Sequence, residues 1–286
     1  MSALPEFILT VRCPDTKGLV AAVSTALAAC DFTIVEATQF NDPVDEQFFM
    51  RVVFRPCSGA EEAAAFERAF APVAERFAMT WGLRSAAQRP RTLIAVSKFG
   101  HCLTDLIHRW KAGSLPVDIV GVVSNHEDFR AFVEWSALPF HHLPITPDSK
   151  PAQERRFLDL VDALDVDLLV LARYMQVLSP AFCDAVAGRC INIHHSFLPG
   201  FKGANPYKQA HARGVKIIGA TAHYVTADLD EGPIIEQAVE RVEHSHSPAD
   251  LMEIGRDIEC AVLARAVRWH AEGRVMLNGV RTIVFS

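Results

Sequence analysis

An amide and an imidazole lie two residues apart in the segment CINIHHSFLP (190–199). The apolar residues around them predict a buried strand. Because side chains alternate along a strand, Asn192 and His194 project to one side and Ile193 to the other. Open α/β sheets place their ligands at such strand ends. A carboxamide can donate to an oxygen that gains negative charge, and an imidazole can move a proton near neutral pH. The pair therefore indicates chemistry at a carbonyl group.

A second polar segment, DLDEGP (228–233), follows further along the chain. It separates two predicted antiparallel strands, 219–227 and 234–242. A loop that is rich in carboxylates and fixed by Gly-Pro is suited to aim one acid at an imidazole. The alternative interpretation is an ordinary acidic surface turn.

The stretch INIHHSFLPGFKGANPYKQAHARGVKIIGATAHYVTADLDEGPIIEQ (191–237) resembles the formyltetrahydrofolate deformylases. They belong to the folate-dependent formyltransferase superfamily, together with glycinamide ribonucleotide formyltransferase. The resemblance implies hydrolysis of 10-formyltetrahydrofolate to formate and tetrahydrofolate, which would supply formate and balance the one-carbon folate pool. It further implies that Asn192, His194 and Asp230 are the catalytic residues, with Asp228 as the other candidate acid.

The resemblance also implies where the folate binds. The family holds the pterin ring against backbone groups of the loop after the fourth strand, here RYMQVL (173–178). Backbone recognition tolerates varied side chains in such a loop. The alternative is that the apolar members of the loop belong to the core. We expect the folate contacts to be Met175, Gln176, Val177, Leu178, His223 and Lys202.

Strand alternation turns His195 away from His194, so we expect His195 to be structural. A zinc site formed by these two residues and His223 is the alternative, but no closely spaced Cys or Glu would complete it. We therefore expect no metal and no cofactor, since the folate is the substrate.

The segment SKFGHCLT (97–104) bears on the choice between hydrolysis and transfer. Glycinamide ribonucleotide formyltransferase binds its phosphorylated amine through a glycine-rich loop at a helix N-terminus. Here the segment has one glycine, and Phe99 and His101 would obstruct a phosphate. We expect water to be the acceptor. The alternatives are phosphoribosylglycinamide (GAR) formyl transfer and a non-catalytic amino-acid sensor.

The sequence predicts two domains, and the expected catalytic and folate-binding residues lie in the second. Residues 1–85 predict a β-α-β-β-α-β order, which is ferredoxin-like, and the family resemblance implies an ACT domain there. The polar segment 86–91 is the expected linker, and 92–286 the formyltransferase-type domain. In it, apolar strands alternate with helices, which indicates a Rossmann-like, mostly parallel sheet covered on both faces. The predicted fold class is therefore α/β. The predicted strands are 7–13, 32–40, 47–54, 79–84, 92–97, 117–125, 138–145, 167–172 and 190–195, and the predicted helices are 17–29, 61–78, 102–111, 127–136, 151–164, 180–186 and 248–271.

ACT modules commonly bind small amino acids near a strand–helix turn, here CPDTKGL (13–19). The resemblance therefore implies glycine or methionine as an effector that contacts Asp15, Gly18 and Leu19. The alternative is a plain helix start. An uncovered edge strand in this domain also favours a homo-oligomer, either a dimer or a tetramer.

Composition excludes several classes of function. The chain of 286 residues is 50% hydrophobic and only 22% charged, which is typical of a globular protein. A net charge of −6 argues against a nucleic-acid partner. Neither an export signal nor a membrane span is expected. Seven cysteines, an odd number without CxxC spacing, indicate reduced thiols and a cytoplasmic protein.

Overall fold

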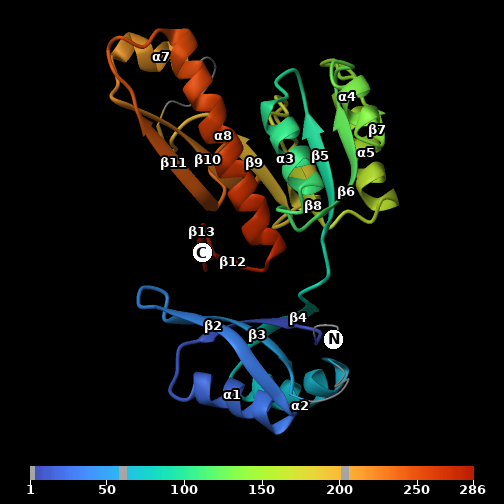
Figure 1. The fold of residues 1–286 in the computed structure, drawn as a ribbon, viewed down its shortest axis with the longest axis vertical. Coiled ribbons are helices and arrows are strands. Elements are labelled where there is room, and N and C mark those ends of the chain that lie inside the picture. The colour runs from blue at the N-terminus through green and yellow to red at the C-terminus, as the bar shows by residue number, and fades with distance from the viewer. Residues whose placement is uncertain (1–3, 58–62, 201–205) are drawn as a thin grey trace. The chain divides into compact units, whose positions relative to one another are not determined.

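The computed structural model describes residues 4–57, 63–200 and 206–286, and it divides into two compact units (Figure 1). The division falls between Arg89 and Pro90, within the predicted linker 86–91. The prediction assigned all of 92–286 to the second domain. In the structure, Glu272–Met276 and Ile283–Ser286 group instead with the first unit, whereas Leu277–Thr282 remain with the second. Among the described residues, no helix is long and apolar enough to span a membrane.

The first unit is an antiparallel sheet with two helices. Its strand order is β2-β3-β1-β4, which together with the β-α-β-β-α-β chain order matches the predicted ferredoxin-like arrangement. Aromatic side chains form much of its core, with Phe66 and Phe70 of the second helix stacked at 5.2 Å between ring centroids. The elements are β1 (Phe7–Pro14), α1 (Leu19–Ala29), β2 (Phe32–Asp42), β3 (Gln47–Pro56), α2 (Ala63–Arg76) and β4 (Thr80–Ser85).

Ion pairs and hydrogen bonds hold the end of the chain within the first unit. Arg51 is 3% exposed, and its guanidinium contacts Glu36 at 2.8 Å and the Glu272 carbonyl at 3.0 Å. Arg274 contacts Glu36 at 3.1 Å and donates to the Phe285 carbonyl at 3.0 Å. A buried guanidinium is tolerated only when it is paired in this way. The C-terminal residues therefore complete the polar contacts of the first unit.

The second unit is built on a seven-stranded sheet with the order β11-β10-β9-β8-β5-β6-β7. The strands from β9 to β7 are parallel, and β10 and β11 are added antiparallel. All four residues of β8 are buried, as expected for a parallel strand covered on both faces. The elements are β5 (Arg91–Val96), α3 (His101–Lys111), β6 (Asp118–Ser124), α4 (Arg130–Trp135), β7 (Phe140–His142), α5 (Lys150–Ala163), β8 (Leu168–Leu171), α6 (Pro180–Ala185), β9 (Cys190–His194), α7 (Pro206–Arg213), β10 (Ile217–Tyr224), β11 (Ile234–Arg241) and α8 (Pro248–Ala271). A hairpin of β12 (Val275–Asn278) and β13 (Arg281–Val284) ends the chain.

Two elements differ from the sequence predictions. The predicted strand 138–145 is shortened to the three residues of β7, and α7 was not predicted at all. Strand order reverses at β5, since the chain adds β6 and β7 on one side and β8 and β9 on the other. Ligands of open α/β sheets bind outside the carboxyl ends of the strands at such a reversal. The loops after β5, β8 and β9 therefore meet where a site is expected.

Candidate active site

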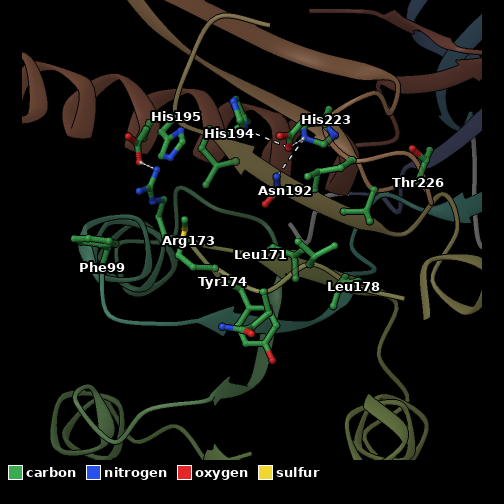
Figure 2. A pocket seen from close by; sticks show the side chains of 18 of the residues that line it. Phe99, Leu171, Arg173, Tyr174, Leu178, Asn192, His194, His195, His223 and Thr226 are labelled. Carbon is green, nitrogen blue, oxygen red and sulfur yellow. Dashed lines mark hydrogen bonds and ion pairs between the residues drawn. The ribbon is translucent and has the colours of Figure 1, made fainter. Parts of the chain in front are cut away.

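A cavity of about 520 Å³ is formed by the residues that follow β5, β8 and β9, with further walls from the β10–β11 loop, α7 and α8 (Figure 2). Its size and its mainly apolar lining are typical of a small-molecule site. Asn192, His194 and Asp230 all line it, so the structure brings the three predicted catalytic residues together.

Asn192 is oriented by a histidine on the neighbouring strand. The antiparallel register pairs Asn192 with His223, which places the two side chains next to each other. His223 Nδ1 lies 2.9 Å from the Tyr224 carbonyl, so Nδ1 must carry a proton and donate it. In the neutral ring Nε2 is then an acceptor, and Asn192 Nδ2 donates to it at 3.2 Å. This arrangement fixes which way the carboxamide faces and leaves its second N–H available to a ligand.

His194 is paired with Asp230. Its Nδ1 lies 3.1 Å from Asp230 Oδ1, and both side chains are largely buried. His194 Nε2 has no hydrogen-bond partner among the described residues. Because an ionised carboxylate can only accept, the Nδ1 atom must be the donor. In neutral His194, Nε2 would then have its lone pair free to accept a proton.

The β10–β11 loop presents Asp230 rather than Asp228 to the imidazole. Asp228 is exposed, whereas the side chain of Asp230 is 12% exposed and reaches His194. Asp230 has φ +59°, a left-handed conformation that Asp tolerates better than most residues. A Cβ at Gly232 would lie 1.7 Å from the Tyr224 carbonyl oxygen, so only glycine lets the loop pack this closely. The prediction of a loop that aims one acid at the imidazole matches this geometry.

Burial and neighbouring charges set the protonation states around this pair. Burial alone would raise the pKa of Asp230, but the hydrogen bond to His194 and the nearby imidazoles outweigh it and lower the pKa below 3.8. Burial lowers the pKa of His223, against the opposing effects of the Tyr224 carbonyl and Asp230. At neutral pH, Asp230 is thus a carboxylate and His223 a neutral ring.

The loop after β8 contributes all four of its predicted folate contacts to the cavity: Met175, Gln176, Val177 and Leu178. Met175 is 51% and Val177 58% exposed, so the alternative that these two are core residues is wrong. Leu178 is partly buried against the core. The Met175 backbone N–H donates to Ser97 Oγ at 3.1 Å, which holds the loop in place. His223 also lines the cavity, whereas Lys202 lies outside the described residues.

The expectation that His195 faces away from His194 is wrong. Because β9 ends at His194, strand alternation stops there, and His195 lines the same cavity. Its ring centroid lies 5.0 Å from that of His194. Burial, together with the Arg173 charge, lowers the pKa of His195 to about 4.

We expect His195 to make stability depend on pH. The ordinary pKa of histidine is 6.5, so between pH 6.5 and about 4 the unfolded chain binds a proton at His195 that the folded protein does not. The free energy of unfolding should therefore fall as the pH falls through this window, by at most about 3 kcal/mol from this group. Urea unfolding at both ends of the window measures the change. An equal change in His195→Gln would contradict the assignment.

Sequence reasoning missed a buried carboxylate on α8. Glu259 is 1% exposed and lines the cavity. It accepts hydrogen bonds from Tyr207 Oη at 2.7 Å and from His101 Nε2 at 2.7 Å, and it forms an ion pair with Arg173 Nη1 at 3.2 Å. We call these four residues the Glu259 network. The signal that could have found it is a glutamate between Ile258 and Val262, on the buried side of an amphipathic helix.

The same cluster includes the one potential metal-ligand group found among the described residues, formed by His101, Cys102 and Glu259. Both carboxylate oxygens of Glu259 already accept hydrogen bonds, and Arg173 lies beside one of them. The donor set therefore fits an internal ion pair better than a cation. Likewise, both ring nitrogens of His223 have protein partners, unlike those of a zinc ligand.

In the first unit, the predicted effector turn is a sharp connection from β1 to α1. Gly18 has φ +97° and precedes the helix, and apart from its two chain neighbours no described residue has a heavy atom within 4 Å of where its Cβ would be. The Asp15 N–H donates to the Glu46 carbonyl at 2.8 Å. Leu19 is 2% exposed and belongs to the core, so only its backbone could contact a ligand.

In a comparison with known protein families, residues 90–267 match the family Formyl transferase. The chain is 51% identical over 284 residues to the formyltetrahydrofolate deformylase of Corynebacterium sp. (strain P-1), covering 99% of both chains. It is also 51% identical over 280 residues to the formyltetrahydrofolate deformylase of Bacillus subtilis (strain 168), covering 97% of this chain and 93% of that one.

Solved structures give a concordant result. The crystal structure of formyltetrahydrofolate deformylase from Burkholderia mallei is 55% identical, with a TM-score of 0.94 over 99% of this chain and 100% of that chain. Glycinamide ribonucleotide transformylase 1 from Symbiobacterium toebii is 30% identical, with a TM-score of 0.65 over 69% of this chain and 95% of that chain. The chain thus resembles the first protein along its whole length and the second along about two thirds.

Proposed function

The chain belongs to the formyltetrahydrofolate deformylase family, and on this premise we propose that Asn192, His194 and Asp230 hydrolyse 10-formyltetrahydrofolate to formate and tetrahydrofolate. The observation that carries the assignment is the ion pair between His194 and Asp230 beside an oriented Asn192, within one cavity. Hydrolysis of a formamide requires an oxyanion donor and a group that transfers a proton. The three residues supply both.

Asn192 is the oxyanion donor. Water adds to the formyl carbon, and the carbonyl oxygen becomes negatively charged in the tetrahedral intermediate. The N–H of Nδ2 that is not bound to His223 is available to this oxygen. Because His223 holds the carboxamide in place beforehand, little reorganisation is needed when the charge develops.

His194 carries the proton. Its Nδ1–H is held by Asp230, which leaves Nε2 to accept a proton from the attacking water. A carboxylate next to the imidazole stabilises the imidazolium that forms. The imidazolium then returns the proton to N10 of the folate as the bond between the formyl carbon and N10 breaks. Formate and tetrahydrofolate are the products, and neither step requires a metal or another cofactor.

The folate lies against the loop that follows β8. Met175 and Val177 expose apolar side chains there, and they can cover a flat ring. The backbone groups of the loop can bind the polar edge of the pterin, as the family resemblance implies. Lys202 and His223 complete the proposed contacts.

Water, rather than an amine, accepts the formyl group. Phe99 is 41% exposed and lines the cavity at the start of α3, where a phosphorylated acceptor would need open backbone. One assay separates the alternatives: incubate the protein with 10-formyltetrahydrofolate alone and follow tetrahydrofolate release. Turnover without an added acceptor supports hydrolysis. Turnover only with glycinamide ribonucleotide would indicate formyl transfer, and no turnover with either would favour an amino-acid sensor.

The first unit serves as an ACT domain that binds glycine or methionine at the β1–α1 turn. The left-handed Gly18 and the open space around its Cα leave the backbone accessible to a small ligand that contacts Asp15 and Leu19. Thermal-shift titration with each amino acid should raise the melting temperature, because a ligand that binds only the folded state stabilises it. No shift with either amino acid would argue against the effector site.

A homo-oligomer, dimer or tetramer, forms through the same unit. Its edge strand β2 has eleven residues, and Ile34, Val35 and Phe40 are all more than a third exposed. Exposed apolar edge strands are commonly covered by a second chain. Light scattering after gel filtration gives the molecular mass.

The seven cysteines without CxxC spacing support placing the enzyme in the cytoplasm.

A further inference from the structure

The cavity has two chemically different sides. Figure 2 shows Leu178 and Thr226 on one side of His194, and Phe99, Arg173 and His195 on the other. The first side includes Leu178, at the end of the proposed folate loop 173–178. The second side includes Arg173, at the start of that loop, and an acceptor that approached His194 from this side would meet these residues.

The Glu259 network occupies this second side. Each oxygen of Glu259 is already engaged, Oε1 by Tyr207 and Oε2 by His101 and Arg173. An amine that donated a hydrogen bond to this carboxylate would have to compete with these partners for a side chain that is only 1% exposed. Displacing Glu259 from Arg173, which is 8% exposed, would leave a buried charge unpaired and is therefore unfavourable.

The space needed by Tyr207 is built into α8. A Cβ at Gly255 would lie 2.0 Å from Tyr207 Oη and 2.3 Å from Tyr207 Cζ. A glycine inside a helix is less favourable than alanine by about 1 kcal/mol. The structure tolerates this glycine where the ring crosses the helix to reach Glu259, one helical turn further on.

Contacts with aromatic rings complete the second side of the cavity, which we call the acceptor wall. The Arg173 guanidinium lies over the Phe99 ring, 5.3 Å from its centroid. The His195 and Tyr207 rings follow at 6.3 Å between centroids, in an edge-on arrangement. Aromatic rings and a paired guanidinium thus line the cavity on this side of His194.

We propose that the Glu259 network, with Gly255 making room for Tyr207, closes this side of the cavity to amines and restricts the acceptor to water. The inference rests on the hydrolytic function proposed above and assigns a specificity-determining role to Tyr207, Gly255 and Glu259. With the acceptor wall opened, an amine nitrogen bonds to the formyl carbon, the bond from that carbon to N10 breaks, and the proton lost by the amine is delivered to N10. No other reactant is needed.

Competition between nucleophiles tests the proposal. The full-length enzyme and its variants are incubated with 10-formyltetrahydrofolate plus hydroxylamine or the larger O-methylhydroxylamine, with enzyme-free blanks. Total tetrahydrofolate, formate and the two formyl hydroxamates are then measured. Tyr207→Ala removes the ring, and Gly255→Ala forces it aside while keeping every charge. Trp135→Ala is the control, because it removes an aromatic residue that is 80% exposed and does not line the cavity.

We expect the wild type and Trp135→Ala to form almost only formate. In Tyr207→Ala and Gly255→Ala, the ratio of hydroxamate to formate should rise by roughly tenfold or more, as for other pockets that discriminate by size. An unchanged ratio in both variants, or free hydroxamate formation by the wild type, would overturn the proposal. If Tyr207→Ala does not fold, Gly255→Ala decides the result. Absence of tetrahydrofolate release from the wild type would instead count against the hydrolytic function itself.

Discussion

Replacing Asp230 by Asn should reduce kcat by about 10³- to 10⁴-fold, by analogy with the same exchange in other carboxylate–histidine pairs. The carboxylate holds the proton of His194 on Nδ1 across 3.1 Å, which leaves Nε2 able to accept a proton. A carboxamide can present an N–H to Nδ1 instead, and the imidazole then holds its proton on Nε2. Steady-state release of tetrahydrofolate measures the loss.

The backbone conformation of residue 230 should be the same in Asp230→Asn as in the wild type. Asn tolerates the left-handed conformation of residue 230 at least as well as Asp, so the loop and the melting temperature should change little. Asp228→Asn is the matched control on the same loop, and because Asp228 is exposed its loss should be far smaller. If Asp228→Asn abolished turnover while Asp230→Asn cost only a few-fold, the acid would be misassigned.

Removal of the amide at position 192 should have the second-largest effect. Asn192→Ala deletes an oxyanion donor, and such losses reduce kcat by about 10²- to 10³-fold. KM should change little, because the hydrogen bond strengthens only as charge develops in the transition state. Initial rates over a range of 10-formyltetrahydrofolate concentrations separate the two parameters.

An isosteric variant shows whether the donor or merely the side-chain volume is important. Asn192→Asp keeps the shape but places a second carboxylate near the developing negative charge, and it cannot donate to His223 Nε2 when ionised. We expect Asn192→Asp to be slower than Asn192→Ala. A smaller loss of kcat in Asn192→Asp than in Asn192→Ala would indicate that residue 192 acts through packing instead.

The parts of the site that lie on regular elements could be predicted from the sequence. The two-residue period of a strand placed Asn192 and His194 on one side, and both line the cavity. The same rule failed one residue later, because β9 ends at His194 and His195 is no longer held by the alternation. Period-based reasoning depends on where an element ends, and strand ends are set by tertiary contacts.

Other features depend on contacts between distant residues. The choice between Asp228 and Asp230 required the left-handed backbone at Asp230 and the close packing of Gly232. Glu259 lies 86 residues after Arg173 in the chain, and no local pattern joins them. Helix α7 also escaped prediction, since its eight residues carry no continuous apolar stripe.

The path of the last residues affects how the protein can be dissected. A recombinant fragment that stops at Arg89 would lack the Glu272 carbonyl that Arg51 contacts. It would also lack Arg274, which forms an ion pair with Glu36. A guanidinium with 3% exposure would then depend on a single carboxylate. Isolated production of the first unit therefore calls for a tethered copy of residues 272–286, joined through a short flexible spacer, rather than a simple truncation.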